Sequence, residues 1–167
     1  MGETGDQKGT GKEASPQPAG LMLHLEVVLP ARRSHVFQAL TDPGELAKWW
    51  GPHGFTSPHV EFDPKVGGGY RIAMQPPDRE LFHLQGEFRE VDPPTRLAYT
   101  FRWEEPDPDD VETIVTLSLR DLDESTELVL DQGAFATEPR RALHEQGWTD
   151  SFERLRGLMS SGTTAPG

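Results

Sequence analysis

Imidazole and carboxylate side chains gather in one short stretch that contains His53, His59, Glu61 and Asp63. Groups of this kind are ligands of Zn²⁺, so the stretch is the first candidate for a metal site. Its spacing matches none of the standard zinc sites, and His59 and Glu61 lie two residues apart on what reads as extended chain. We therefore predict that the protein has no metal site and no cofactor.

Two other motifs resemble sites of known chemistry without completing them. His144-Glu145 is not followed by the second histidine of an HExxH zinc-protease helix. The run Gly67-Gly68-Gly69 lacks the GK[ST] ending of a phosphate-binding loop, so we interpret it as a turn or bulge before a strand. The chain contains no cysteine, which excludes disulfides, thiolate metal sites and a cysteine nucleophile.

An enzyme would need an acid or a base in surroundings that shift its pKa. Along the strongest predicted strand, His83 and Glu87 fall on the face opposite Phe82 and Phe88. Glu90 shares the apolar face but lies near the end of the strand. We therefore predict no catalytic residue, and an enzyme remains an alternative rather than the leading interpretation.

Large apolar side chains give a stronger signal than the polar ones. They alternate at period two along four neighbouring predicted strands, and the last helix adds two aromatic rings. A strongly curved sheet with a helix across its concave side often leaves a cavity for a small molecule. The predicted ligand-binding residues are Trp49, Trp50, Tyr70, Phe82, Phe88, Tyr99, Phe101, Trp103, Leu117, Trp148 and Phe152, with the first two at the mouth of the cavity. The alternative is that these side chains are simply core.

The elements that carry these residues follow from hydrophobic periodicity and turn residues. Strands are expected near residues 21–29, 55–62, 70–74, 82–88, 97–103, 111–119 and 126–130, two short helices near 32–42 and 44–50, and a long helix after Thr137 as N-cap. Short connections favour an antiparallel meander covered by the long helix. The predicted fold is α+β: a helix-grip with a curved antiparallel sheet of about six strands around a long C-terminal helix, and two short helices after the first strand.

Composition sets the limits of the domain and excludes some partners. Residues 1–20 and 160–167 hold no large aromatic side chain, so we expect disordered tails on either side of one domain at 21–159. The net charge of −12 argues against nucleic-acid binding, and no apolar run approaches the roughly 20 residues of a membrane span. The acidic segments 104–112 and 121–127 read as solvated hairpin ends at opposite ends of the sheet. We expect a cytoplasmic protein.

Several segments in order along the chain carry a family resemblance: VVLPARRSHVFQALTDPGELAKWWGP, VEFDPKVGGGYR, GEFREVDPPTRLAYTFRW and HEQGWTDSFERL. They resemble the SRPBCC superfamily and, within it, the family of homologues of the activator of the heat-shock chaperone ATPase, over residues 23–159. The resemblance implies a START-like, birch-pollen-allergen-like fold with a hydrophobic cavity. Wider relatives include lipid carriers, polyketide cyclases and hormone receptors.

The leading hypothesis is a module that binds a small hydrophobic or aromatic molecule between the curved sheet and the C-terminal helix. One alternative is an enzyme on the same scaffold, either a cyclase or a hydrolase. The other is a chaperone-related or stress-related interaction module, which would expose an apolar patch. A homodimer is also possible.

Overall fold

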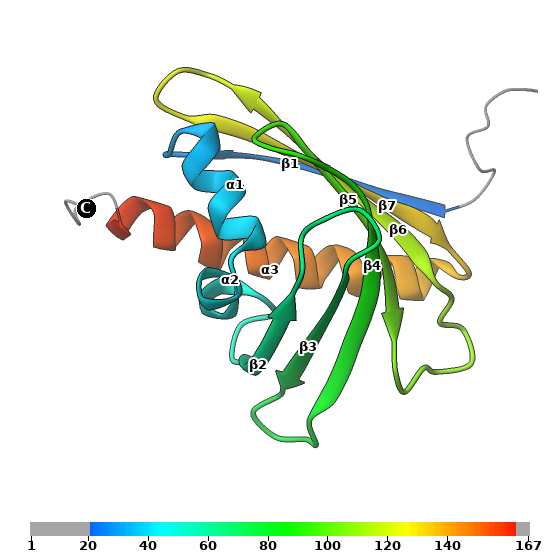
Figure 1. Cartoon of the computed structure of the whole chain (residues 1–167). Coiled ribbons are helices and arrows are strands. Elements are labelled where there is room, and N and C mark those ends of the chain that lie inside the picture. The colour runs from blue at the N-terminus through cyan, green and yellow to red at the C-terminus, as the bar shows by residue number, and fades with distance from the viewer. Residues whose placement is uncertain (1–20, 163–167) are drawn as a thin grey trace, which may run out of the picture.

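The computed structural model describes residues 21–162, which form an antiparallel sheet of seven strands and three helices (Figure 1). The strands are β1 (Leu21–Leu29), β2 (Thr56–Phe62), β3 (Gly69–Gln75), β4 (Phe82–Asp92), β5 (Arg96–Trp103), β6 (Thr113–Asp121) and β7 (Thr126–Phe135). The helices are α1 (Arg33–Thr41), α2 (Pro43–Trp49) and α3 (Glu138–Gly162). Residues 1–20 and 163–167, where we predicted tails, lie outside the described residues.

The sheet curves around α3, and α1 and α2 lie on the same side of it (Figure 1). Its strand order is β1-β7-β6-β5-β4-β3-β2, so consecutive strands pair except where β1 closes against β7. The predicted α+β helix-grip fold is confirmed, with seven strands in place of about six. Among residues 21–162, no helix combines the length and the apolarity that crossing a membrane requires.

Local chemistry explains where the helices begin. The Asp42 carboxylate accepts a hydrogen bond from the backbone N–H of Glu45 at 3.0 Å and caps α2, which starts at Pro43. Thr137 caps α3 as expected, because its hydroxyl accepts the backbone N–H of Arg140 at 3.2 Å. The helix then continues to residue 162, so residues 160–162, which we placed in a tail, are helical.

The last strand is longer than its sequence suggests. We predicted a strand over residues 126–130, but β7 continues to Phe135, pairing there with Leu21 of β1. Gln132 and Gly133 interrupt the apolar alternation, which hides this extension from a periodicity argument. The extension matters for function because it places Gln132 beneath α3.

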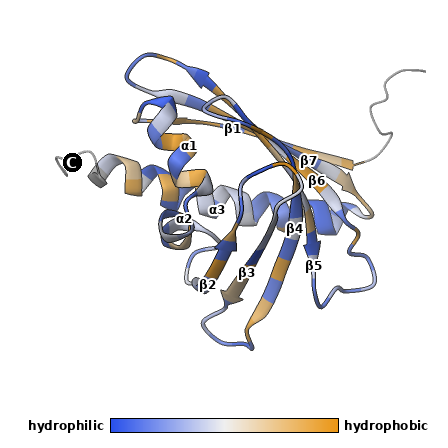
Figure 2. Ribbon diagram, viewed as in Figure 1, coloured by the Kyte–Doolittle hydropathy of each residue, from blue (hydrophilic) through white to orange (hydrophobic). Residues whose placement is uncertain are grey.

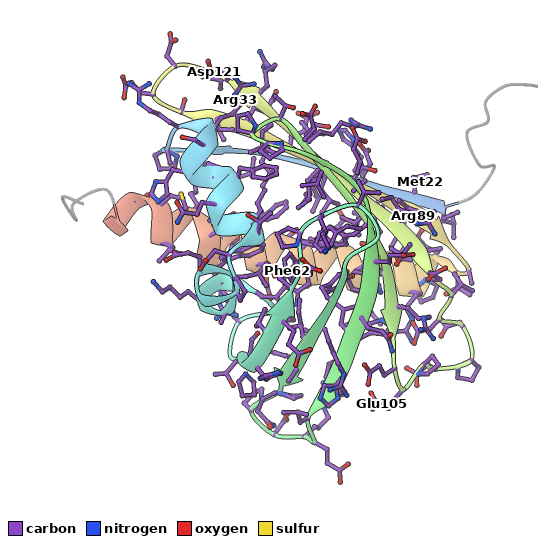
Figure 3. All side chains as sticks on the ribbon, in the orientation of Figure 1. Met22, Arg33, Phe62, Arg89, Glu105 and Asp121 are labelled. Atoms are coloured by element: carbon purple, nitrogen blue, oxygen red, sulfur yellow. The ribbon has the colours of Figure 1, made fainter. Side chains whose placement is uncertain are left out.

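One half of the concave face is filled by aromatic rings. Phe62, Tyr70, Phe88 and Tyr99 pack with ring centroids 5.0 to 6.4 Å apart, and Figure 3 shows Phe62 in the interior between the sheet and the helices. Apolar and polar residues alternate along the strands that carry them (Figure 2). This ring cluster is closely packed, so this half of the concave face is core.

Gly86 allows a ring to lie across strand β4. A Cβ atom at this position would collide with the carbonyl oxygen of Thr100 and would approach the ring of Tyr70. The Tyr70 hydroxyl donates to that same carbonyl at 2.6 Å. A glycine inside a strand often marks a bulge, but the irregularity in the β4–β5 ladder lies between Phe88 and Glu90. Close approach, rather than a bulge, is therefore the reason for this glycine.

Candidate functional site

The other half of the concave face encloses a cavity of about 630 Å³ beneath the first half of α3. Strands β3, β4 and β5 form one wall, α3 the other, and the connections around residues 50–55 and 105–110 complete it. The lining residues are Trp50, Gly51, Pro52, Phe55, Met74, Arg79, Phe82, Phe101, Trp103, Glu105, Asp107, Asp110, Arg140, Leu143, His144, Gln146, Gly147, Trp148 and Ser151. The lining therefore combines large apolar rings with five charged side chains.

Five of the eleven predicted residues line this cavity. They are Trp50, Phe82, Phe101, Trp103 and Trp148. The indoles of Trp50 and Trp148 meet edge to face with centroids 5.2 Å apart, and Trp103 contacts the other two rings at 5.1 and 5.3 Å. Ligand contact at these residues stays a prediction, but the structure brings them together around one space.

The other six predicted residues do not line this cavity: Trp49, Tyr70, Phe88, Tyr99, Leu117 and Phe152. All six are buried, and three of them belong to the ring cluster around Phe62. Trp49, expected at the mouth, is only 1% exposed and donates its indole N–H to the carbonyl oxygen of Ala39. Alternation along a strand identifies the concave face but does not say which half of it other side chains fill.

Contacts with α3 hold Trp50 in the wall of the cavity. The guanidinium of Arg154 donates to the carbonyl oxygens of Trp50 and Gly51, each at 3.0 Å. The backbone N–H of Gly51 in turn donates to the buried hydroxyl of Ser151 at 2.9 Å. These bonds fix the segment after α2 against the helix, so the position of Trp50 follows from the position of α3.

A buried polar chain fixes the indole of Trp148. Its N–H donates to Gln132 Oε1 at 2.7 Å, and Gln132 Nε2 donates to the Thr113 hydroxyl at 2.8 Å. All three residues are buried. The indole N–H groups of Trp50 and Trp103, by contrast, have no hydrogen-bond acceptor within residues 21–162. Both residues line the cavity, so their indole N–H groups are unsatisfied donors beside it.

His144 is a polar residue of the cavity that the sequence argument missed. Its ring packs against Phe101, Phe135 and Trp103, with centroids 5.1, 4.9 and 5.9 Å away. Burial, reinforced by the charge of Arg140, lowers the pKa of His144 to about 4, so the imidazole is neutral at pH 7. No described side chain or backbone group forms a hydrogen bond with it.

A simple signal would have found His144. It precedes Trp148 by four residues on a predicted helix, and residues four apart share a helix face. Alternation along the strands does not reach this position, and His144-Glu145 by itself resembles only an incomplete zinc motif. Four of the eight charged or polar side chains of the lining lie on α3, where strand periodicity does not identify them.

Acidic residues of the β5–β6 connection pack against the start of α3. The guanidinium of Arg140 lies 3.0 Å from Asp107 and 3.1 Å from Asp109, both within hydrogen-bond geometry. Its Nε also lies 3.1 Å from Asp110 Oδ1, as an ion pair without hydrogen-bond geometry. The hydrogen bond from Arg140 holds the pKa of the Asp109 carboxyl below its ordinary value. This segment is therefore only partly the solvated hairpin end that we predicted, since the Asp110 side chain is 7% exposed.

The residues considered for a metal do not form one site. His59 contacts Glu61 at 2.7 Å, whereas His53, in the segment after α2, lies 2.9 Å from Glu153 of α3. Asp150 completes that group, and a second group joins His83, Glu104 and Glu105, the last of which also lines the cavity. In each group three potential ligand atoms lie within 4.8 Å of one another, but exposed acidic groups of this kind are common without a metal.

Comparisons with known proteins agree with this architecture. The sequence model of the family described as "Activator of Hsp90 ATPase homolog 1-like protein" matches residues 30–160. The structure is similar to that of protein CV1439 from Chromobacterium violaceum, with 30% sequence identity, a TM-score of 0.73, and coverage of 83% of this chain and 96% of that one. It is also similar to the AHSA1 protein SPO3351 from Silicibacter pomeroyi, with 25% identity, a TM-score of 0.74, and coverage of 83% and 97%. A third similar structure is NE0264 from Nitrosomonas europaea, with 25% identity, a TM-score of 0.74, and coverage of 89% and 99%. No curated protein matches the sequence.

Proposed function

Because this chain belongs to the activator of Hsp90 ATPase homolog 1-like family within the SRPBCC superfamily, we propose that it binds a small hydrophobic or aromatic molecule. The site is the cavity between β3–β5 and α3. The observation that carries the proposal is an unfilled space of about 630 Å³ walled by six large aromatic side chains. Its volume lies within the roughly 300–1,000 Å³ of small-molecule sites, which are mostly apolar with a few placed polar groups.

The polar groups of the cavity favour a ligand that also forms hydrogen bonds. Trp50 and Trp103 each offer an indole N–H, and the neutral imidazole of His144 offers one donor and one acceptor. Burying these groups beneath an apolar ligand would leave them without partners, which costs about 1–3 kcal/mol for each group. A molecule with an apolar body and one or two polar atoms therefore fits the lining best.

The test is a fluorescence titration with N-phenyl-1-naphthylamine, an uncharged probe that brightens in apolar surroundings. We expect saturable binding of one probe per chain. The Gly147→Phe variant should weaken it at least tenfold, because Gly147 lines the cavity and a Cβ there meets nothing nearer than Pro52 at 4.0 Å. The matched control is Gly157→Phe on the exposed face of the same helix. Binding that does not saturate, or equal weakening in both variants, would overturn the proposal.

One observation favours an enzyme as the second candidate. His144 places an imidazole in the cavity, whereas we predicted that no acid or base would lie there. No carboxylate or hydroxyl within residues 21–162 hydrogen-bonds to the ring, so the orienting partner of a typical base–nucleophile arrangement is missing from the described residues. Turnover of naphthyl esters by the wild type that is abolished in His144→Phe would favour this candidate over simple binding.

The remaining expectations stay predictions from the sequence. They are a cytoplasmic location, a role in the stress response, an interaction module of the chaperone-related kind, and a homodimer. Size-exclusion chromatography with light scattering measures the last of these directly, and a mass near 18.6 kDa would contradict the dimer.

A further inference from the structure

Five charged side chains are among the lining residues of the cavity, and we call this group the rim. It consists of Arg79, Glu105, Asp107, Asp110 and Arg140. An arginine in an apolar cavity usually suggests a ligand carboxylate, because a guanidinium binds that group with two parallel hydrogen bonds. The availability of the two arginines therefore decides which charge a ligand of this cavity can carry.

The positive charge of Arg140 is already paired. Three aspartates, at positions 107, 109 and 110, lie within 3.1 Å of its guanidinium, and its side chain is only 17% exposed. Arg79 lies on the exposed turn after β3 and is paired with the adjacent Asp78 at 3.9 Å. Neither arginine offers an uncompensated positive charge to a ligand.

Glu105 differs from the other acidic residues of the rim. Its carboxylate accepts the backbone N–H of His83 at 3.3 Å, but no ion pair within the described residues involves it. Together with the partners of the two arginines, the rim and its surroundings hold two guanidinium groups and five carboxylates. The carboxylates are those of Asp78, Glu105, Asp107, Asp109 and Asp110. The rim therefore has an excess of negative charge, with Glu105 as its unpaired member.

The walls beside the rim suit a positive charge as well. Aromatic faces attract ammonium groups through the ring quadrupole, and tryptophan attracts them most strongly. Three tryptophans line this cavity, and Trp103 belongs to the same strand end as Glu105. Building on the proposed function, we propose that the ligand is an aromatic or apolar amine whose uncharged body lies among the rings and whose ammonium group lies at the rim beside Glu105.

The same surroundings disfavour a ligand that carries a carboxylate. It would approach an excess of acidic groups and find both arginines paired, so its desolvation would have no compensating partner. Glu105 is exposed and its charge acts through water, so we expect effects of about tenfold in affinity rather than a complete exclusion. The same reasoning makes the preference sensitive to salt.

The test uses three probes that share one naphthalene ring: 1-naphthylmethylamine, 1-naphthalenemethanol and 1-naphthoate. Calorimetry in 20 mM NaCl should show the amine binding about tenfold more tightly than the carboxylate, with the alcohol between them, and the differences should shrink in 500 mM NaCl. Binding of the alcohol with no advantage for the amine would overturn this inference and leave the proposed function standing. Binding of none of the three would overturn both.

A pair of variants separates the rim from the overall charge of the chain. Glu105→Gln should lower the affinity for the amine about threefold and leave that for the alcohol unchanged. The control is Asp123→Asn, which makes the same change of charge in the β6–β7 hairpin, where asparagine tolerates the positive φ of 74°. Figure 3 shows that Glu105 and Asp121, next to this control, lie at opposite ends of the molecule. An equal loss in both variants would assign the preference to net charge and overturn the role of Glu105.

Discussion

Acidification from pH 7 to pH 5 is expected to destabilise the folded chain through His144, and the His144→Phe variant should escape that loss. The ring is surrounded by Phe101, Trp103 and Phe135, which cannot solvate an imidazolium. The guanidinium of Arg140 opposes its protonation as well. Phenylalanine has a similar size and suits the same aromatic surroundings, so the variant is expected to fold.

The sign and size follow from the two pKa values. The pKa of His144 is about 4 in the folded chain, against an ordinary value of 6.5, so the unfolded chain binds the proton first as the pH falls. The stability from neutral His144 is therefore fully present above pH 6.5 and is lost as the pH falls toward 4. With about 1.4 kcal/mol for one pKa unit, the loss between pH 7 and pH 5 is about 2 kcal/mol.

The assay is urea unfolding at pH 7, 6 and 5, followed by circular dichroism, for the wild type and His144→Phe. The wild type should lose about 2 kcal/mol more than the variant over this range. His24→Gln is the control of opposite sign, because hydrogen bonds to Glu26 and Asp131 raise the pKa of His24 and make it stabilise the folded chain at low pH. Equal losses in the wild type and His144→Phe would refute the reasoning.

Three further predictions concern packing and hydrogen bonds. Gly147→Ala and Gly157→Ala should each raise the free energy of unfolding by up to about 1 kcal/mol, because alanine favours a helix more than glycine does. The new Cβ atom has room at both positions, since the nearest atom is 4.0 Å away or farther. If urea unfolding shows that only Gly147→Ala destabilises the chain, the Cβ atom does not fit at position 147. Gln132→Leu should lower the free energy of unfolding by about 1–3 kcal/mol, because the buried indole N–H of Trp148 and the buried hydroxyl of Thr113 lose their partner. An unchanged midpoint of urea unfolding would refute this prediction. Gly86→Ala should lower the free energy of unfolding by more than about 3 kcal/mol, because the new Cβ atom overlaps the carbonyl oxygen of Thr100. A midpoint of thermal unfolding within a few degrees of the wild type would contradict this prediction.

The fold could be predicted because its signals are local. Alternation at period two, turn residues and helix caps are each visible within about ten residues, and Thr137 begins α3 as expected. The prediction fell short where a local signal was interrupted. Gln132 breaks the apolar pattern of β7, and its burial is explained only by Trp148 and Thr113, which come from other elements.

The cavity could be predicted only in outline. The concave face was identified correctly, but Phe62, which the predicted ligand-binding set did not include, helps to fill one half of it. Whether a side chain on that face is core or lining depends on such neighbours, and strand periodicity does not contain them. The rim was missed for the same reason, because Arg140 meets its aspartates only once the β5–β6 connection folds over α3.

The central claim is that a small apolar molecule lies between β3–β5 and the first half of α3. Nuclear Overhauser effects between 1-naphthalenemethanol and the assigned side chains of the chain test it most directly. The account predicts cross-peaks from the naphthalene protons to the indoles of Trp50, Trp103 and Trp148. Cross-peaks confined to Leu25 and Phe152, which line a separate cavity of about 160 Å³, would contradict it.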